Sequence, residues 1–217
     1  MTYSVKEMFY TLQGEGFHTG RPAVFCRFTG CNLWSGREQD RQTSICQFCD
    51  TDFIGTDGQN GGKFTTPAEL AATINSFWPV EMAEKFVVFT GGEPALQLDN
   101  ELIEAMHTYG FECAVESNGT LPLPNNLDWV CISPKGSSVI VTTKCDELKL
   151  VYPQTEALPE RFEHFQATYR YLSPKNNYRD QTIVPGENPY TAQCINFCLN
   201  NPKWRLTLQS HKILNID

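Results

Sequence analysis

Short apolar runs alternate along this chain with polar segments that contain glycine. Runs of four to six residues that are bounded by Gly, Pro, Asn or Ser are typical of buried β-strands. The pattern predicts strands at 23–28, 86–90, 112–115, 129–132, 148–151, 169–172 and 204–208. An alternating stretch at the N-terminus leads into Gln13-Gly14-Glu15-Gly16. Two glycines there predict either a loop whose backbone approaches a ligand closely or an ordinary turn.

Three segments carry helix signals. Residues 66–69 read Thr-Pro-Ala-Glu, with threonine as N-cap, proline at the first helical position and glutamate completing a capping box. A second helix is predicted over 101–109, where Gly110 ends it. A third begins at Asn188-Pro189. The segment 55–63 is rich in Gly, Asp and Asn without periodicity and is predicted to be a loop.

Strands separated by helices or long links favour a largely parallel sheet. Polar, glycine-bearing sequence follows almost every strand at its C-terminal end, which is the end that carries the chemistry in barrels of this kind. The second half has fewer helices than strands, so a complete eight-fold barrel is not expected. We predict an α/β fold, an incomplete TIM-type barrel of about six mostly parallel strands with an extra terminal strand and about three core helices. Residues 1–217 are expected to form one domain.

Composition and charge narrow the possible partners. The formal net charge of −8 argues against nucleic-acid binding, which depends on Lys and Arg neutralising phosphates. No run approaches the roughly 18 consecutive apolar residues that suggest a membrane span. The first residues lack the charged and then apolar pattern of a signal peptide. We expect a cytoplasmic protein with no nucleic-acid or membrane partner.

The nine cysteines divide by context. Six lie in or beside apolar strands or on the late helix and are expected to be buried free thiols in a reducing compartment. These six are Cys26, Cys113, Cys131, Cys145, Cys194 and Cys198. The other three, Cys31, Cys46 and Cys49, share a polar loop, 31–51, after the strand 23–28. A Cys-x-x-Cys pair is a common unit of thiolate sites, and we predict that the three hold a [4Fe–4S] cluster with one iron open to a small molecule.

This cysteine loop resembles that of radical S-adenosylmethionine (SAM) enzymes, whose usual motif is Cys-x-x-x-Cys-x-x-Cys after the first strand of a partial barrel. Here Ser35 stands at the position of the second cysteine, and Cys46 supplies that thiolate after an insertion of eleven residues. Loop closure becomes costlier by roughly 1.4 kcal/mol when three intervening residues become fourteen. Cluster ligation can absorb that cost.

A long cysteine spacing occurs in some members of one subgroup, the 7-carboxy-7-deazaguanine synthases, and the resemblance to them extends across nearly the whole chain. The segments that carry it are, in order, Glu7-Met8-Phe9, Thr11-Leu12-Gln13-Gly14-Glu15-Gly16, Arg27, Gly30-Cys31-Asn32-Leu33, Cys49-Asp50-Thr51, Thr90-Gly91-Gly92-Glu93-Pro94, Glu116-Ser117-Asn118-Gly119, Ser133-Pro134-Lys135 and Gln209-Ser210-His211-Lys212. Their joint occurrence identifies the chain as a member of this subgroup.

The resemblance implies a radical-SAM lyase of 7-deazapurine (queuosine-type) biosynthesis. In its reaction 6-carboxy-5,6,7,8-tetrahydropterin loses ammonia and contracts its ring to 7-carboxy-7-deazaguanine. The cluster passes one electron to SAM, which cleaves to methionine and a 5′-deoxyadenosyl radical. That radical removes the hydrogen at C6 of the pterin and later returns it, so SAM acts catalytically and no side chain is expected to be catalytic. The protein orients the reactants and excludes water.

The resemblance also implies the ligands of each group. Cys31, Cys46 and Cys49 bind three irons, and the amino and carboxylate groups of SAM occupy the fourth. A Mg²⁺ is expected on the hydroxyl of Thr51, with substrate oxygens and water as its other ligands. The residues expected along SAM are Phe48, Cys49, Asp50, Gly92, Glu116, Ser117, Ser133, Pro134, Lys135, Ser173, Pro174, Lys175 and Asn176.

The residues expected at the pterin are Leu12, Gln13, Gly14, Glu15, Arg27, Thr90, His211 and the terminal residue Asp217. Arg27 suits the substrate carboxylate as a bidentate partner. For several of these positions a purely structural role is the alternative to ligand binding. Arg27 and Glu116 could be salt-bridge partners, Gly91-Gly92-Glu93-Pro94 a simple turn, and Thr51 a turn hydroxyl. The other histidines, His18, His107 and His164, are expected to be structural.

Two rival functions share part of this pattern. A radical-SAM activase would share the cysteine loop but would leave 12–16 and 209–212 unexplained. A structural zinc site could use the three cysteines with a histidine such as His18, although zinc sites of that kind are usually closed by four ligands. The resemblance further implies a flavodoxin or ferredoxin as electron donor and a homodimer.

Overall fold

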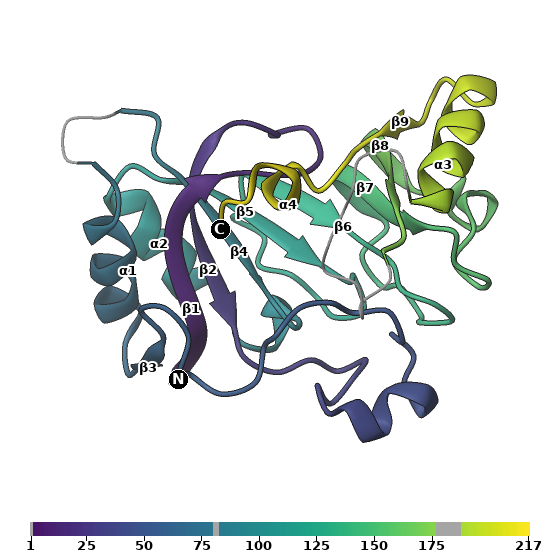
Figure 1. Cartoon of the computed structure of the whole chain (residues 1–217). Helices are drawn as coiled ribbons and strands as arrows, with labels where there is room; N and C mark the ends of the chain where they lie inside the picture. Colours follow the sequence, from purple (N-terminus) through teal and green to yellow (C-terminus); the bar gives the residue numbers. More distant parts are fainter. Residues whose placement is uncertain (1, 80–82, 177–187) are drawn as a thin grey trace.

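The computed structural model describes residues 2–79, 83–176 and 188–217, and its strands form one nine-stranded sheet (Figure 1). The order is β3-β1-β2-β4-β5-β6-β7-β8-β9. The strands are β1 (Tyr3–Leu12), β2 (Pro22–Phe28), β3 (Gly62–Phe64), β4 (Phe86–Gly91), β5 (Glu112–Ser117), β6 (Trp129–Ile132), β7 (Lys144–Tyr152), β8 (Gln166–Pro174) and β9 (Arg205–Leu206).

The seven strands β2 and β4 to β9 run parallel, whereas β1 is antiparallel to both β2 and β3. Within the described residues the edge strands β3 and β9 do not pair with each other, so the sheet is open. The prediction of an incomplete, mostly parallel barrel is confirmed. Each strand predicted from an apolar run is present.

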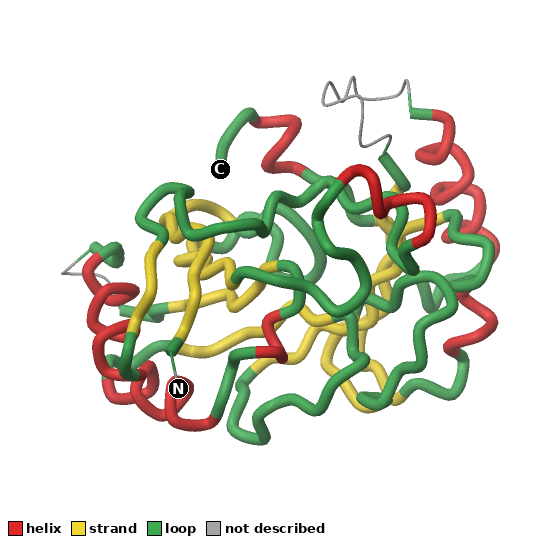
Figure 2. Tube along the Cα trace, turned by 90° about the horizontal axis from the view of Figure 1, so that it is seen from below, coloured by secondary structure: helices red, strands yellow, loops and turns green. Residues whose placement is uncertain are grey.

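The helices are α1 (Pro67–Ser76), α2 (Asn100–Thr108), α3 (Pro189–Asn200) and the short α4 (Ser210–Leu214), with 3₁₀ turns η1 (Glu38–Thr43), η2 (Pro94–Leu96) and η3 (Pro159–Phe162). Figures 1 and 2 both show α1 and α2 together at one end of the sheet and α3 at the other. These three are the predicted helices. No helix in the described part of the chain is long and apolar enough to span a membrane.

Helix α1 begins where the sequence predicts, with one change in its cap. The Thr66 hydroxyl accepts a hydrogen bond from the backbone N–H of Glu69 at 3.2 Å. The Glu69 carboxylate accepts from the backbone N–H and the hydroxyl of Thr65, one residue before the cap. The orphan N–H of Glu69 is thus satisfied as in a capping box, while the Glu69 carboxylate reaches one residue further back than a capping box requires.

Strand β3 lies partly inside the segment that was predicted to be a loop, and that prediction is wrong at 62–63. Residues 62–64 pair with Tyr3–Val5 of β1. Residues 62–64 form no apolar run, and they become a strand because β1 has an unpaired edge beside them. The local sequence pattern therefore does not reveal this strand.

Side chains on the outer face of the sheet build two cores. Helices α1 and α2 pack on β1, β2, β4 and β5 around Phe28, Phe89 and Ile103. At the other end, α3 covers β7 and β8 around Leu150 and Leu172. Of the six cysteines predicted to be buried free thiols, all are free and only Cys198 is partly exposed.

The inner face changes character along each strand. Apolar side chains of Ala23, Phe86, Val88 and Ala114 fill the end of the barrel where the strands begin. Further along, Thr90 of β4 and Glu116 of β5 are polar. Because alternate residues of a strand share a face, the same strands supply an apolar floor and a polar mouth.

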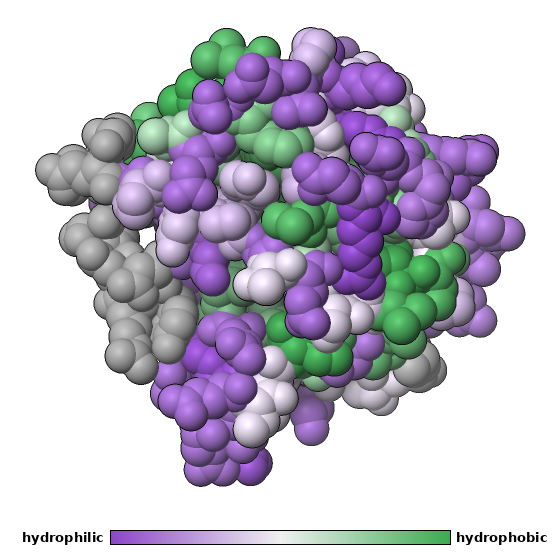
Figure 3. Space-filling view, turned by 90° about the vertical axis from the view of Figure 1, so that its right-hand side faces the viewer, coloured by the Kyte–Doolittle hydropathy of each residue, from purple (hydrophilic) through white to green (hydrophobic). Residues whose placement is uncertain are grey.

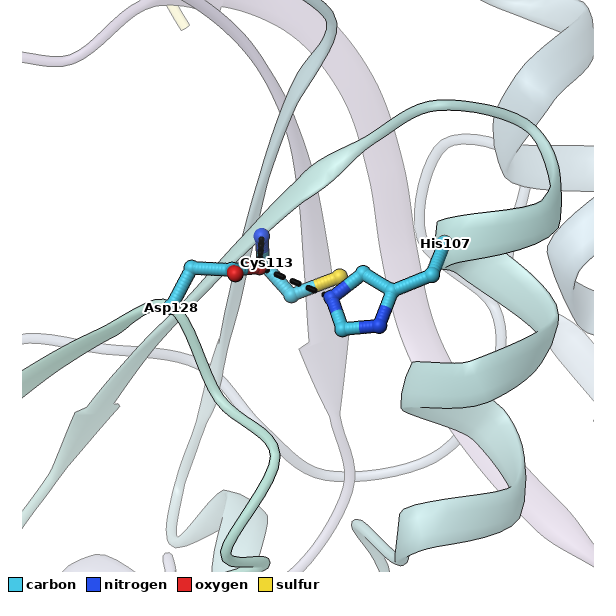
Figure 4. Close-up of side chains that lie close together, drawn as sticks. All are labelled: His107, Cys113 and Asp128. Carbon is cyan, nitrogen blue, oxygen red and sulfur yellow. Dashed lines mark hydrogen bonds and ion pairs between the residues drawn. The ribbon is translucent and has the colours of Figure 1, made fainter.

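A hydrogen-bonded group of three side chains closes the link between α2 and β6 (Figure 4). The Asp128 carboxylate accepts from the backbone N–H of Cys113 and lies 2.8 Å from Nε2 of His107. The Cys113 sulfur donates weakly to the Phe111 carbonyl at 3.9 Å. These partners give His107 the structural role that the sequence predicts.

The side of the molecule that carries α3 is largely hydrophilic, and its hydrophobic residues lie in separate patches (Figure 3). The most exposed large hydrophobic side chains are Leu199, 79% exposed, and Val139, 78% exposed. Isolated exposed apolar residues are normal on globular proteins and need no partner.

Replacing a buried residue of α2 tests the outer core. Ile103 is fully buried, whereas the adjacent Glu104 is exposed. Ile103→Ala is expected to lower the free energy of unfolding by about 2–5 kcal/mol, because it removes buried methylenes and leaves a cavity. Glu104→Ala is expected to change it by less than about 0.5 kcal/mol. Urea unfolding measures both, and equal effects would contradict the packing of α2.

Candidate active site at the open end of the barrel

A pocket of about 260 Å³ opens where the parallel strands end. It gathers residues from the loops after six strands and from the C-terminal segment. The predicted site residues that line it are Leu12, Gln13, Gly14, Glu15, Arg27, Cys46, Phe48, Cys49, Asp50, Thr51, Thr90, Gly92, Glu116, Ser117, Ser133, Lys135, Ser173, Pro174, Asn176, His211 and Asp217. Residues more than 200 positions apart therefore share one cavity.

Three predicted site residues, Cys31, Pro134 and Lys175, do not belong to this lining. The carbonyl of Pro134 accepts from the Gln154 amide at 3.3 Å. The Lys175 ammonium lies 5.4 Å from the ring centre of Phe48, which is part of the lining. Lys175 therefore contacts a lining residue without being one itself.

Cys46 and Cys49 line one side of the pocket, and Cys31 lies beside the lining residue Gly92. The Cys46 thiol donates to the Cys49 sulfur, which raises the pKa of Cys46 and lowers that of Cys49. Burial raises the pKa of Cys31, and the nearby Cys49 sulfur adds to the rise. Ser35 is exposed, and its hydroxyl donates to Asp40 at 2.6 Å.

The end of β4 passes very close to the end of β2. A Cβ placed on Gly92 would lie 2.2 Å from the carbonyl oxygen of Gly30 and 2.8 Å from the Cβ of Cys31. Gly91 has φ +150°, and a Cβ there would lie 2.4 Å from the carbonyl oxygen of Phe28. Only glycine fits at both positions, and this close approach brings the cysteine loop against the Gly-Gly segment.

Glu93 is fully buried and connects two loops of the site. Its carboxylate accepts from the Ser117 hydroxyl at 2.7 Å, from the backbone N–H of Asn118 at 2.7 Å and from that of Ala95 at 3.0 Å. Burial raises the pKa of Glu93, while these three bonds favour the charged form. Glu93 therefore joins the segment after β4 to the segment after β5.

A buried ion-pair cluster forms another wall. The Nζ of Lys149 lies 2.7 Å from Glu15 and 3.1 Å from Glu116, and the Gln13 amide donates to Glu116 at 2.9 Å. Burial alone would lower the pKa of Lys149, but Glu116 and Glu15 raise it well above its usual value. Burial raises the pKa of Glu116, yet Lys149 brings it below its usual value.

Lys149 was missing from the predicted site. Glu147 and Lys149 alternate in β7 with Leu148 and Leu150, which belong to the outer core. The sequence does contain a sign of this role, namely two charged residues on the inner face of a buried strand. A lysine at such a position requires a buried carboxylate partner.

The glycines of the loop after β1 are required by contacts within the protein. A Cβ on Gly14 would lie 2.1 Å from the His211 ring, and one on Gly16, at φ +72°, would lie 2.0 Å from the Glu147 carboxylate. Glu147 in turn accepts from the backbone N–H of Phe17 at 3.0 Å. The glycines here allow a close approach of side chains from α4 and β7, and the predicted approach of a ligand to this backbone stays a prediction.

Arg27 forms the salt bridge that the sequence left open and also lines the pocket, while its contact with a substrate carboxylate stays a prediction. Its Nε donates to the Glu7 carboxylate of β1 at 2.8 Å, and its side chain lines the pocket. The ion pair orients the guanidinium from one side, and the pocket lies against it.

The C-terminal segment, which contains α4, supplies Gln209, His211 and Asp217 to the pocket lining, and its ribbon runs across the sheet in Figure 1. The hydroxyl of Ser210 donates to the Gly14 carbonyl at 2.7 Å, and the Thr11 hydroxyl donates to the main-chain oxygen of Asp217 at 3.1 Å. Lys212 forms an ion pair with Asp50. The segment thus fastens the loop after β1 to the cysteine loop.

The donor set suits a cluster with three protein ligands. Among the described residues, the cysteines that line the pocket are Cys46 and Cys49, and Cys31 lies beside the lining residue Gly92. His18 packs on Phe86 and Trp129, at 4.8 and 4.4 Å between ring centres, so the zinc site with His18 does not form. A single metal ion needs three or more ligand atoms close together. Within the described chain, His107, Cys113 and Asp128 in Figure 4 have ligand atoms within 4.8 Å of one another, whereas the three loop cysteines do not. The loop cysteines therefore do not converge as tightly as a single ion would need.

Comparison with known proteins agrees with this geometry. A 7-carboxy-7-deazaguanine synthase of Bordetella pertussis is 53% identical over 216 residues, and one of Caulobacter vibrioides is 52% identical, each match covering all of both chains. The crystal structure of QueE from Escherichia coli matches with a TM-score of 0.70 at 27% identity, covering 96% of this chain and 94% of that one. No protein-family model matches the chain.

Removing the buried lysine tests the ion-pair cluster. Lys149→Met leaves Glu15 and Glu116 without their cation and is expected to lower the free energy of unfolding at pH 7 by about 3 kcal/mol. Lys144→Met, at the exposed start of β7, serves as the matched control and should have little effect.

The pH dependence gives a second measurement of the same change. In the native protein the pKa of Glu116 is lowered, so its charge stabilises the fold at neutral pH, and this contribution is lost as the pH falls through that pKa. Without Lys149, burial raises the pKa of Glu116, and acid relieves its unpaired charge. The stability difference should therefore shrink as the pH falls from neutral towards the ordinary glutamate pKa of roughly 4.3, and shrink further below it. A difference that is constant between pH 7 and pH 4 would contradict this account.

Proposed function

Because the chain belongs to the 7-carboxy-7-deazaguanine synthase family, we propose that the pocket at the open end of the barrel is the site where this product is formed. The protein is a radical-SAM lyase that converts 6-carboxy-5,6,7,8-tetrahydropterin to 7-carboxy-7-deazaguanine and ammonia in 7-deazapurine biosynthesis. The observation that carries the assignment of the site is the meeting of Cys46, Cys49, the Gly-Gly segment and Arg27 at one pocket, with Cys31 directly beside the lining residue Gly92.

Cys31, Cys46 and Cys49 would hold the [4Fe–4S] cluster. When bound, the cluster supplies the electron that cleaves SAM reductively and so provides the radical that starts the ring contraction. Three thiolates leave one iron for the amino and carboxylate groups of SAM. The Gly92 backbone lies against Cys31, so its polar groups are placed to bind the SAM amino group.

The rest of SAM would lie along the loops after the parallel strands. Phe48 offers an aromatic face, and Lys175 beside it supports that ring. The Ser117 hydroxyl is already used by Glu93, which leaves Glu116 as the better partner for the ribose. The segments 133–135 and 173–176 complete this wall, although Pro134 and Lys175 do not belong to the lining.

The pterin would bind between Arg27 and the ion-pair cluster. The guanidinium of Arg27 suits the substrate carboxylate, because its planar fork can form two parallel hydrogen bonds. The Glu15 carboxylate, 2.7 Å from the Lys149 ammonium, would accept hydrogen bonds from the amino group of a guanine-like edge. Leu12, Gln13, Gly14, Thr90 and His211 would form the remaining contacts.

Two contacts at the pocket rim complete this proposal. The Thr51 hydroxyl, in the lining, would bind Mg²⁺ together with substrate oxygens and water, since magnesium usually keeps several waters. Asp217 also lines the pocket and would contact the substrate. The fastened C-terminal segment would keep bulk water from the reacting carbon.

Three features outside the pocket also belong to the proposal. A flavodoxin or ferredoxin would supply the electron, and the enzyme would work as a homodimer in the cytoplasm. The nine cysteines are all free in the structure, which supports a reducing compartment. Residues 1–217 would act as one domain, since all strands described join one sheet.

Substituting the loop cysteines tests the cluster assignment. Cys31→Ala, Cys46→Ala or Cys49→Ala is expected to abolish reductive SAM cleavage and to lower iron and sulfide content after anaerobic reconstitution, because each removes one thiolate ligand. Cys26→Ala and Ser35→Ala are the controls and should retain the cluster. The test uses SAM, reductant and the carboxytetrahydropterin under anaerobic conditions. If SAM is consumed while the pterin stays unchanged, the reaction proposed for this pocket is wrong.

Arg27→Gln tests the substrate carboxylate contact. Loss of a charged, bidentate hydrogen-bond partner is expected to lower kcat/KM for the pterin by about 10- to 100-fold. SAM cleavage without pterin should stay near the wild-type rate, since Arg27 is not expected to touch the cofactor. Arg205→Gln on the exposed side of β9 is the control. An unchanged kcat/KM in Arg27→Gln would place the carboxylate elsewhere.

A further inference from the structure

The insertion between Cys31 and Cys46 contains a buried arginine. The side chain of Arg41, on η1, is 8% exposed, whereas its ion-pair partner Glu38 is 64% exposed. Arg37, in the same insertion, is exposed as well. A buried guanidinium on an otherwise hydrophilic 3₁₀ turn requires a structural reason, because burying this charge is costly unless it is well partnered.

The Arg41 guanidinium binds the backbone between the second and third cysteines. Its Nη1 donates to the carbonyl oxygen of Cys49 at 2.9 Å and to that of Gln47 at 3.2 Å. Its Nε donates to Glu38 at 2.8 Å. One side chain thus fixes the direction of two carbonyl groups, one of which belongs to a cluster-binding cysteine.

The same guanidinium also packs on the segment that follows Cys31. It lies 4.0 Å from the ring centre of Trp34, a buried residue whose indole N–H donates to the Arg37 carbonyl at 3.1 Å. Trp34 packs edge-on against Phe53 with 5.6 Å between ring centres. Arg41 therefore connects the beginning of the cysteine loop, next to Cys31, with its end.

We propose that Arg41 is a positioning residue that holds the Cys46–Cys49 segment in its cluster-binding conformation before iron is bound. The inference rests on the proposed function, since it concerns the three cysteines as cluster ligands. A spacing of fourteen residues makes the unbound loop harder to order than the usual spacing of three. Arginine suits this task because it is always charged, offers five donors in a planar fork and stacks on aromatic rings.

The proposal has an electronic consequence. Arg41 places a positive charge beside a segment that carries two of the thiolates. Charge and hydrogen bonding near the ligands help to set the reduction potential of an iron–sulfur cluster. Removing this charge is therefore expected to lower the potential, which a purely steric role would not do.

The first measurement is hydrogen exchange on the metal-free protein. The backbone N–H of Cys46, which donates to the Leu33 carbonyl at 3.4 Å, is a direct reporter. Arg41→Gln is expected to speed exchange across 46–51 by about tenfold or more, because it loses charge-assisted bonds to two carbonyls. Arg37→Gln, the matched exposed control, should stay within about twofold of wild type. Exchange in β4 and β5 reports whether the barrel remains folded.

The second measurement is made after anaerobic reconstitution. Residues that hydrogen-bond to metal ligands typically contribute 10- to 100-fold to metal affinity. We therefore expect Arg41→Gln to bind the cluster about 10- to 100-fold more weakly, measured as the iron and sulfide that remain on the protein when a chelator competes. The potential of the remaining cluster should fall. Arg41→Lys keeps the charge without the fork and should recover the potential but not the exchange protection. If Arg41→Gln loses the whole fold, Arg41→Lys carries the exchange test.

Two results would overturn the inference: a folded Arg41 variant whose 46–51 segment exchanges like wild type, or iron retention equal to that of Arg37→Gln. Neither measurement needs turnover of the pterin. Failure of the wild-type protein to form 7-carboxy-7-deazaguanine would therefore reject the proposed function while leaving the role of Arg41 to be judged on exchange and iron retention.

Discussion

The close approach of β4 to β2 is the constraint on which the site depends. The backbone at Gly91 and Gly92 passes so near to Phe28 and Gly30 that no side chain fits between them. This contact places the cysteine loop, which leaves β2 at Cys31, directly beside the loop after β4. Glu93 then binds the loop after β5. Three loops are thereby brought to one edge by backbone packing, before any ligand contributes.

The interior of the barrel shows how one set of strands serves both stability and chemistry. Apolar residues such as Phe86 and Val88 fill the end where the strands begin. At the opposite end, Lys149 compensates the charges of Glu15 and Glu116. Buried charges are tolerated there because each has an opposite charge or a hydrogen-bond donor within reach. The result is a polar wall in which Lys149 lowers the pKa of the buried Glu116 carboxyl.

The long spacing between the first two loop cysteines is explained by what the insertion contributes. Extra residues make the loop harder to close, but Arg41 contacts both its beginning, at Trp34, and its end, at Cys49. The C-terminal segment adds a second attachment through Lys212 and Asp50. A cysteine motif with this long spacing is therefore compatible with an ordered site, because side-chain contacts restrict the loop as a short spacing otherwise would.

By itself the sequence determined whatever is encoded locally: strands from apolar runs, helix starts from caps such as Thr66, and the site residues that sit in recognisable motifs. Nearly all of these residues line one pocket. Only the tertiary structure decided the pairing of β3, the burial of Glu93, and the partners of Lys149 and Arg41. Each of these depends on which strand or loop lies alongside in space. Edge pairing, desolvation and ion pairing depend on how the chain folds back on itself, whether across the sheet, as for Lys149, or within one loop, as for Arg41, so the pattern of apolar and polar residues does not record them.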